Sequence, residues 1–115
     1  MSQHSLRVTL HHMLEHAERA ERLGRTRSAH ELEDDEVLVL AVIRCLEVLG
    51  EAANRVDRTD QARFAGVPWR QLIGLRNLLI HQYDRLNYAI IERIISDELP
   101  PLIVELRIII AEEYP

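Results

Sequence analysis

Side chains that could do chemistry interrupt an otherwise apolar segment, "LRNLLIHQY", which spans residues 75–83. Arg76 offers a permanent positive charge, and His81 can accept or donate a proton near neutral pH. Cleavage of RNA needs a base for the 2′-hydroxyl, an acid for the leaving oxygen and a cation for the phosphorane. Arg76 and His81 are therefore candidates for phosphate binding and proton transfer, without any metal ion or cofactor.

The spacing of these residues raises a geometric problem, because an ideal helix turns about 100° per residue. On a helix that starts near Pro68, Arg76 and Tyr83 fall in the apolar arc, whereas Asn77 and His81 share the polar side at i, i+4. Arg76 and His81 are then roughly 140° apart. If both act on one phosphate, the helix must end or unwind near His81, or two subunits must complete the site.

A structural role for Arg76 is the alternative to a functional one. An arginine that faces a protein core needs a carboxylate partner, because a lone buried charge is costly. The apolar segment 37–56 carries Glu47 and Glu51, and either could form a buried ion pair with Arg76 that fixes the packing of two helices. Composition and spacing favour this pair, while the functional hypothesis leaves Arg76 for a substrate phosphate.

The elements that must position these residues all follow a helical pattern. Apolar residues recur at helical spacing after Ser2, a candidate N-cap, and the pattern ends at Gly24. Further helices are predicted over residues 37–56, from Pro68 onward, and after a second candidate N-cap, Asn87. The predicted domain spans residues 1–115 and is all-α, an up-down bundle of four or five helices, kinked or broken at Pro100-Pro101.

Composition limits the possible partners. The chain of 115 residues has a net charge of −5 and no lysine, so binding of nucleic acid would have to use a local cluster of arginines. The single cysteine, Cys45, lies in an apolar run and is predicted to be buried, and a protein with one unpaired cysteine is expected in the reducing cytoplasm. No apolar run is long enough to span a membrane. His12 and His16 stand at i, i+4, but a solvated helix face explains them better than zinc does.

Three sequence blocks resemble one known family. The blocks are "AVIRCLEVLGEAANRV", "VPWRQLIGLRNLLIHQYDRLN" and "ISDELPPLIVELRIII", and together they cover roughly residues 35–110. Their order and spacing are similar to those of the HepT-like branch of the HEPN superfamily, which consists of small all-α proteins. The family signature is an arginine, four residues, a histidine, one residue and a tyrosine, which Arg76, His81 and Tyr83 match.

The resemblance implies a HEPN-like fold and a specific activity. Members are toxins of type VII-like toxin–antitoxin modules, and they act as homodimeric, metal-independent endoribonucleases. By resemblance, Arg76 and His81 are catalytic at a cleft between two subunits, with Asn77 and Glu51 in support. The cognate antitoxin is a minimal nucleotidyltransferase that transfers AMP to the motif tyrosine, here Tyr83. The added phosphate would repel RNA.

Two other functions stay open at the level of sequence. The protein could be a non-catalytic partner of a nucleotidyltransferase that binds a nucleotide or presents a substrate. It could also be a structural dimer in which Arg76 and Glu51 form the buried pair described above. The three hypotheses differ in what removal of Arg76 would do to cleavage, to binding and to stability.

Overall fold

Helices form nearly all the regular structure of this computed structural model, which describes residues 2–80, 83 and 85–115. The elements in chain order are α1 (Gln3–Gly24), α2 (Ala29–Asp34), α3 (Glu36–Asn54), α4 (Arg58–Arg63), α5 (Trp69–Ile73), α6 (Leu75–Leu79), α7 (Tyr88–Arg93), a π-helical turn η2 (Ile94–Glu98) and α8 (Leu99–Glu113). The prediction of an all-α protein is confirmed.

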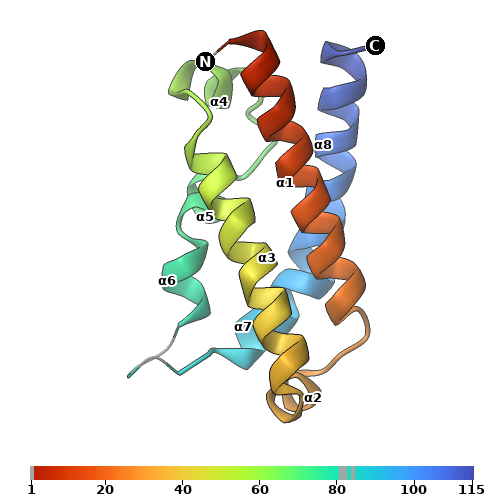
Figure 1. Ribbon diagram of the computed structural model, residues 1–115, viewed down its shortest axis with the longest axis vertical. Coiled ribbons are helices and arrows are strands. Elements are labelled where there is room, and N and C mark those ends of the chain that lie inside the picture. The colour runs from red at the N-terminus through yellow and green to blue at the C-terminus, as the bar shows by residue number, and fades with distance from the viewer. Residues whose placement is uncertain (1, 81–82, 84) are drawn as a thin grey trace.

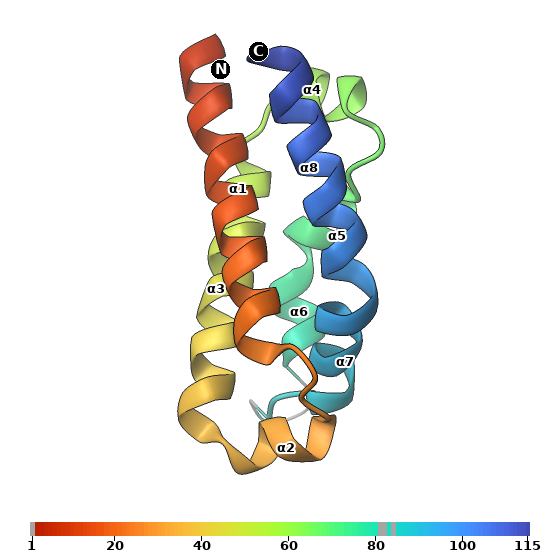
Figure 2. The ribbon, with the colours of Figure 1, turned by 90° about the vertical axis from the view of Figure 1, so that its right-hand side faces the viewer.

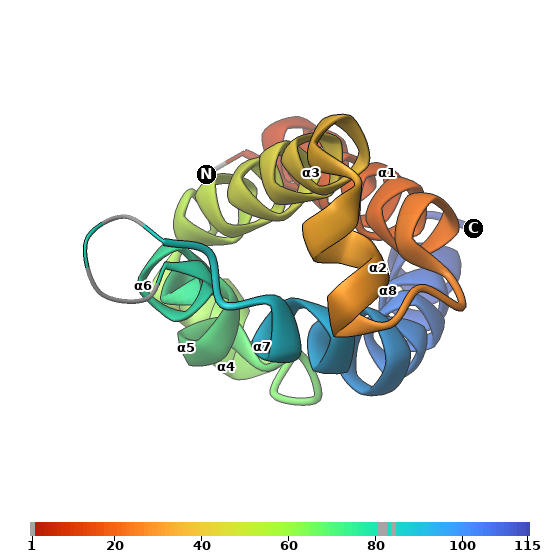
Figure 3. The same cartoon turned by 90° about the horizontal axis from the view of Figure 1, so that it is seen from below.

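The helices are arranged as four legs that run alternately down and up the long axis (Figure 1). α1 forms the first leg, α3 the second, α5 and α6 the third, and α7, η2 and α8 together the fourth. Both termini lie at the same end, and α2 crosses the opposite end, as Figures 2 and 3 show. The arrangement is the predicted up-down bundle, although short helices divide its third and fourth legs.

Local capping sets several of the helix starts. The Ser2 hydroxyl accepts a hydrogen bond from the backbone N–H of Ser5, and the Asn87 side chain accepts one from Ile90. Both predicted N-caps are therefore confirmed. The polar connector that follows α1 contains α2, whose first turn is closed by reciprocal hydrogen bonds between Ser28 and Glu31.

The helical structure of the fourth leg continues through Pro100-Pro101, which lie in the first turn of α8. Neither proline has an N–H, so the usual helical bonds to the carbonyls four residues earlier are lost. One π-helical turn, η2, comes just before them, and the N–H of Leu99 bonds to the carbonyl of Ile94, five residues back. At the predicted kink or break the helical path therefore continues through a wider, π-helical turn, in which Ile94 and Ile95 are buried.

A glycine allows the second and third legs to approach closely. A Cβ atom placed on Gly50 of α3 would lie 2.6 Å from the carbonyl oxygen of Leu72 in α5, a backbone atom that cannot rotate away. Leu72, Leu75 and Leu79 are all buried and anchor the third leg from the same side. The position of α5 and α6 therefore depends on having no side chain at residue 50.

Replacing this glycine should destabilise the protein. We expect Gly50→Ala to lower the free energy of unfolding by about 1–3 kcal/mol, because α5 must shift to admit the methyl group. Gly66→Ala is the matched control, since the three atoms nearest to its Cβ would belong to the carboxylate of Glu105, the flexible end of a side chain. Urea unfolding of both variants measures the difference, and an equal effect would contradict the packing described.

Candidate active site

A glycine divides the third leg in two. Gly74 has φ −88° and ψ 5°, and its N–H bonds to the carbonyl of Arg70 while its own carbonyl accepts from Asn77, only three residues on. Glycine is a poor helix former, so the interruption occurs where the helix is weakest. α5 and α6 are therefore separate short helices, although Leu72, Leu75 and Leu79, at i, i+3 and i+7, still lie on one buried side.

The second interruption ends α6 at Leu79. Ile80 is extended, with φ −105° and ψ 127°, and it pairs with Leu86 in an isolated antiparallel bridge. The carbonyl of Leu79 accepts a hydrogen bond of 2.9 Å from the N–H of Asn87. Of the two alternatives for bringing Arg76 and His81 together, the helix does end before His81.

Arg76 lies on the outside of α6. Its side chain is exposed, whereas Leu75 and Leu79 face the core. Among the residues that the structure describes, no ion pair within 4.0 Å joins Arg76 to Glu47 or Glu51. The prediction of a core-facing arginine in a buried pair is wrong, because the buried side of this leg is narrower than the apolar arc projected from the sequence: Ile73 and Leu78 of the same arc are exposed too.

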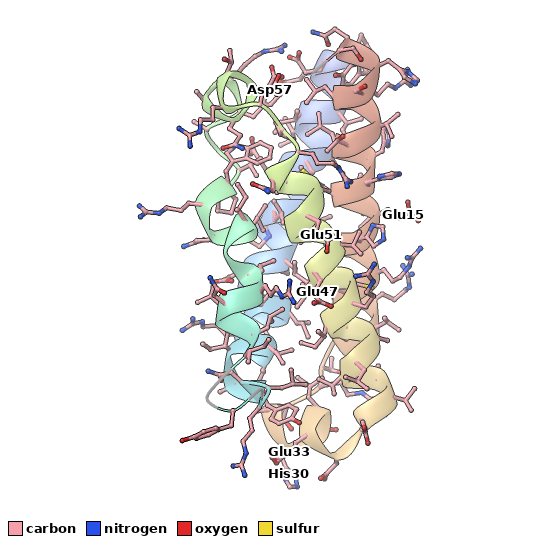
Figure 4. The ribbon with its side chains drawn as sticks, turned by 60° about the vertical axis from the view of Figure 1, so that its left-hand side comes forward. Glu15, His30, Glu33, Glu47, Glu51 and Asp57 are labelled. Carbon is pink, nitrogen blue, oxygen red and sulfur yellow. The ribbon has the colours of Figure 1, made fainter. Side chains whose placement is uncertain are left out.

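A narrow crevice nevertheless brings Arg76 close to the two predicted carboxylates. The crevice lies between α3 and the third leg, holds about 130 Å³, and is lined by residues that include Glu47, Glu51 and Arg76. Figure 4 shows Glu47 and Glu51 one after the other along α3, which contacts α6. The carboxylates can attract the guanidinium across the crevice while leaving it accessible from solvent.

Tyr83 projects from the segment that joins α6 to α7. Its side chain is 93% exposed, and its φ of 57° lies in the left-handed region that non-glycine residues seldom adopt. The helical projection that placed Tyr83 in the apolar arc is wrong, because α6 ends four residues earlier. The phenol is therefore open to solvent.

The two remaining predicted residues of the motif are Asn77 and His81. Asn77 is exposed on α6. The predicted contact between Asn77 and His81 assumed that one helix carries both, whereas α6 ends at Leu79. His81 itself lies outside the described residues.

Other candidate groups take no part in this site. Cys45 is 5% exposed, and burial raises the pKa of its thiol, so it is a core residue as predicted. The rings of His12 and His16 are 6.4 Å apart, and Nδ1 of His16 lies 2.8 Å from the carbonyl oxygen of His12. Within the described part of the chain, no three His, Cys, Asp or Glu side chains gather as metal ligands. No helix in that part is long and apolar enough to cross a membrane.

Charge is distributed unevenly along the chain. Residues 55–93 contain seven arginines against four acidic residues, whereas the rest of the chain has seven arginines against fifteen. Arg58, Arg70 and Arg76 are exposed in this segment, and none has an ion-pair partner among the described side chains. The net charge of −5 for the whole chain therefore does not show the local excess of positive charge in residues 55–93.

A comparison with family models identifies the family of the chain. Residues 13–109 match the family model described as "Ribonuclease HepT-like". The chain belongs to the HepT-like ribonuclease family. No solved structure matches the chain.

Similar proteins carry ribonuclease names. The protein named "Putative RNase MJ1380" from Methanocaldococcus jannaschii is 30% identical over 109 residues, which cover 95% of this chain and 100% of that protein. "Putative RNase TTE0752" from Caldanaerobacter subterraneus is 37% identical over 69% of this chain and 70% of its own length. "Probable ribonuclease HepT" from Thermococcus cleftensis is 29% identical over 59% of this chain and 62% of its own.

The exposure of Arg76 predicts its effect on stability. Arg76→Ala should change the free energy of unfolding by no more than about 0.5 kcal/mol, as surface substitutions usually do. A buried ion pair with Glu51 would instead cost roughly 3–5 kcal/mol when one partner is removed. Urea unfolding followed by circular dichroism distinguishes the two, and a loss in the larger range would restore the structural role.

Proposed function

We propose that this member of the HepT-like ribonuclease family is a metal-independent endoribonuclease and the toxin of a two-gene toxin–antitoxin module. The observation that carries the proposal is the end of α6 at Leu79, which leaves Arg76 exposed just before His81 and Tyr83 in the chain. The family supports the ribonuclease activity. The cytoplasm, where a lone buried thiol such as Cys45 stays reduced, is the proposed site of action.

The proposed chemistry uses the ribose as its own nucleophile. His81 removes the proton of the 2′-hydroxyl, and the 2′-oxygen attacks the adjacent phosphorus. The bond from phosphorus to the 5′-oxygen breaks, and a protonated histidine gives that oxygen its proton. The products are a 2′,3′-cyclic phosphate and a 5′-hydroxyl. Arg76 stabilises the doubly charged phosphorane, and Asn77 supports His81 or the RNA.

A dimer would supply the second histidine. Exposed apolar side chains occur on α3, α5 and α6 and in the chain just after α6: Val37, Ile73, Leu78 and Ile80. Exposed apolar side chains suit contact with a second copy, which would bring two Arg76–His81 motifs to one cleft. Glu51 would then orient Arg76 from across the crevice that both residues line.

RNA binding would use the arginine-rich third leg. Arg58 and Arg70 line an open hollow of about 720 Å³ at the start of α5, together with Gln61, Gln71 and Trp69. Arginine binds phosphate through a planar pair of donors, and glutamine amides can add neutral hydrogen bonds. A single RNA strand that runs along this leg would reach Arg76, which explains how an acidic protein can bind a polyanion.

The proposed antitoxin is a minimal nucleotidyltransferase that modifies Tyr83. The phenol oxygen attacks the α-phosphorus of ATP, the bond to the β-phosphate breaks, and pyrophosphate leaves. The exposure of Tyr83 supports access by a second enzyme. The bulk and negative charge of AMP beside the active residues would then exclude RNA. The alternative function is a non-catalytic partner that presents a nucleotide or substrate to this transferase.

Cleavage without a metal is the first test. In EDTA the purified protein should cut single-stranded RNA and leave 2′,3′-cyclic phosphate ends. His81→Ala should lower the rate about 100- to 10,000-fold, the usual contribution of an acid–base group. Arg22→Ala, at an exposed arginine of α1, is the control and should cut normally. If the wild-type protein binds RNA without cutting it, the non-catalytic alternative holds.

Modification of Tyr83 is the second test. Co-expression with a cognate minimal nucleotidyltransferase should add the mass of one or more AMP units to the intact protein. Tyr83→Phe should abolish the gain, whereas Tyr114→Phe, near the other end of the bundle, should keep it. An AMP adduct that persists in Tyr83→Phe would contradict this site.

A further inference from the structure

A groove runs beside the segment that carries Tyr83. It holds about 840 Å³, and its walls come from the end of α2, the start of α3 and the chain that leads into α7. The described lining residues are Glu33, Glu36, Val39, Leu40, Arg85, Leu86, Asn87, Tyr88 and Ala89. The volume is that of a site for a small molecule or a single nucleotide.

Specific hydrogen bonds hold the first wall in place. Asp35 ends α2 and caps α3, since its carboxylate accepts from the N–H of Leu38. The N–H of Ala29 donates to Glu92 of α7 at 2.9 Å, which ties α2 to the fourth leg. Glu33 and Glu36 lie on either side of the junction between α2 and α3 at Asp35, and both side chains are exposed.

The second wall continues directly from the proposed active site. Leu86 is paired with Ile80, and the N–H of Asn87 bonds to Leu79, so this wall is fixed to the end of α6. Arg85 is exposed, two residues after Tyr83. If the phosphate of one nucleotide lies near Arg76 and Tyr83, the next nucleotide of the same RNA strand would therefore lie near the groove.

The chemistry of the groove fits a base better than a phosphate. Two carboxylates repel an anion and accept hydrogen bonds only, so they favour a ligand that presents N–H or O–H donors, and the N–H donors of an RNA ligand belong to its bases. Leu40 and Leu86 give an apolar surface, and the half-buried Tyr88 gives an aromatic one, on which a planar base can lie. Arg85 at the same groove can bind the phosphate attached to that base.

Among the four bases, guanine has the edge that a carboxylate binds best. Its N1–H and 2-amino group are adjacent donors and can both bond to one carboxylate. Adenine and cytosine place an unprotonated ring nitrogen beside their amino group, and uracil places its single N–H between two carbonyls. An acidic groove would bring acceptor against acceptor with these three bases.

We infer that the groove is a subsite for a guanine base of single-stranded RNA, next to the cleaved phosphodiester, with Glu33 and Glu36 as its specificity-determining residues. The inference rests on the ribonuclease activity proposed above. Proteins often read single-stranded RNA by stacking a base and bonding to its Watson–Crick edge, and this groove provides both interactions.

Cleavage of matched RNAs tests the inference. The substrates are uridine oligonucleotides with one guanosine, inosine or adenosine, where inosine lacks the 2-amino group. Wild-type kcat/KM should be roughly ten-fold or more higher for guanosine than for adenosine, the size of a bidentate base contact, and inosine should fall between them. Glu33→Gln and Glu36→Gln should each reduce this ratio, and the double variant should bring it close to one.

Control measurements separate the two proposals. Glu112→Gln, at an exposed glutamate near the end of α8, should keep the guanosine preference. Cleavage with no preference, or a preference that survives in the double variant, would overturn the guanine subsite but not the ribonuclease. If the wild-type protein cuts no RNA, the ribonuclease proposal fails, and calorimetric binding of 5′-GMP against 5′-AMP decides the subsite. Tighter GMP binding that the double variant loses would support it, and equal or absent binding would overturn it.

Discussion

The hydrogen bond from the N–H of Asn87 to the carbonyl of Leu79 is the constraint on which the candidate site depends. A helix end leaves its last carbonyls without partners, and here a residue eight positions on satisfies one of them. The adjacent pairing of Ile80 with Leu86 turns the chain back at the same point. Because α6 stops there, Tyr83 extends into solvent instead of packing into the bundle.

The rest of the bundle holds this chain reversal in place. Leu72 and Leu79 bury the inner side of the third leg, and Gly50 lets α3 lie directly against the backbone of α5. The outer side of the same leg remains available, with Arg70 and Arg76 exposed to solvent. Stability and the proposed chemistry thus use opposite sides of one short helical leg, which is why we expect its polar residues to tolerate substitution.

The sequence predicted the fold well because helical periodicity and capping are local properties. Ser2 and Asn87 signalled their helix starts within four residues of sequence, and the structure confirms both. The orientation of Arg76 was predicted wrongly, because only a narrow part of the projected apolar arc, which holds Leu75 and Leu79, is buried. The exposure of Tyr83 was predicted wrongly because α6 ends at Leu79, whose carbonyl bonds to Asn87. A periodic projection contains neither effect. The groove beside Tyr88 was also missed, since its walls come from segments about 50 residues apart.

The central claim is that RNA binds on the outer side of α6 and the chain that follows it. Titration of isotope-labelled protein with a DNA strand, which lacks the 2′-hydroxyl and cannot be cleaved, tests this claim by NMR. The guanidinium signal of Arg76 and the ring signals of Tyr83 should show the largest chemical-shift changes. The guanidinium signal of Arg25, which is paired with Glu21, should stay unchanged. Shifts confined to α1 and α8, with none at Arg76 or Tyr83, would contradict the account.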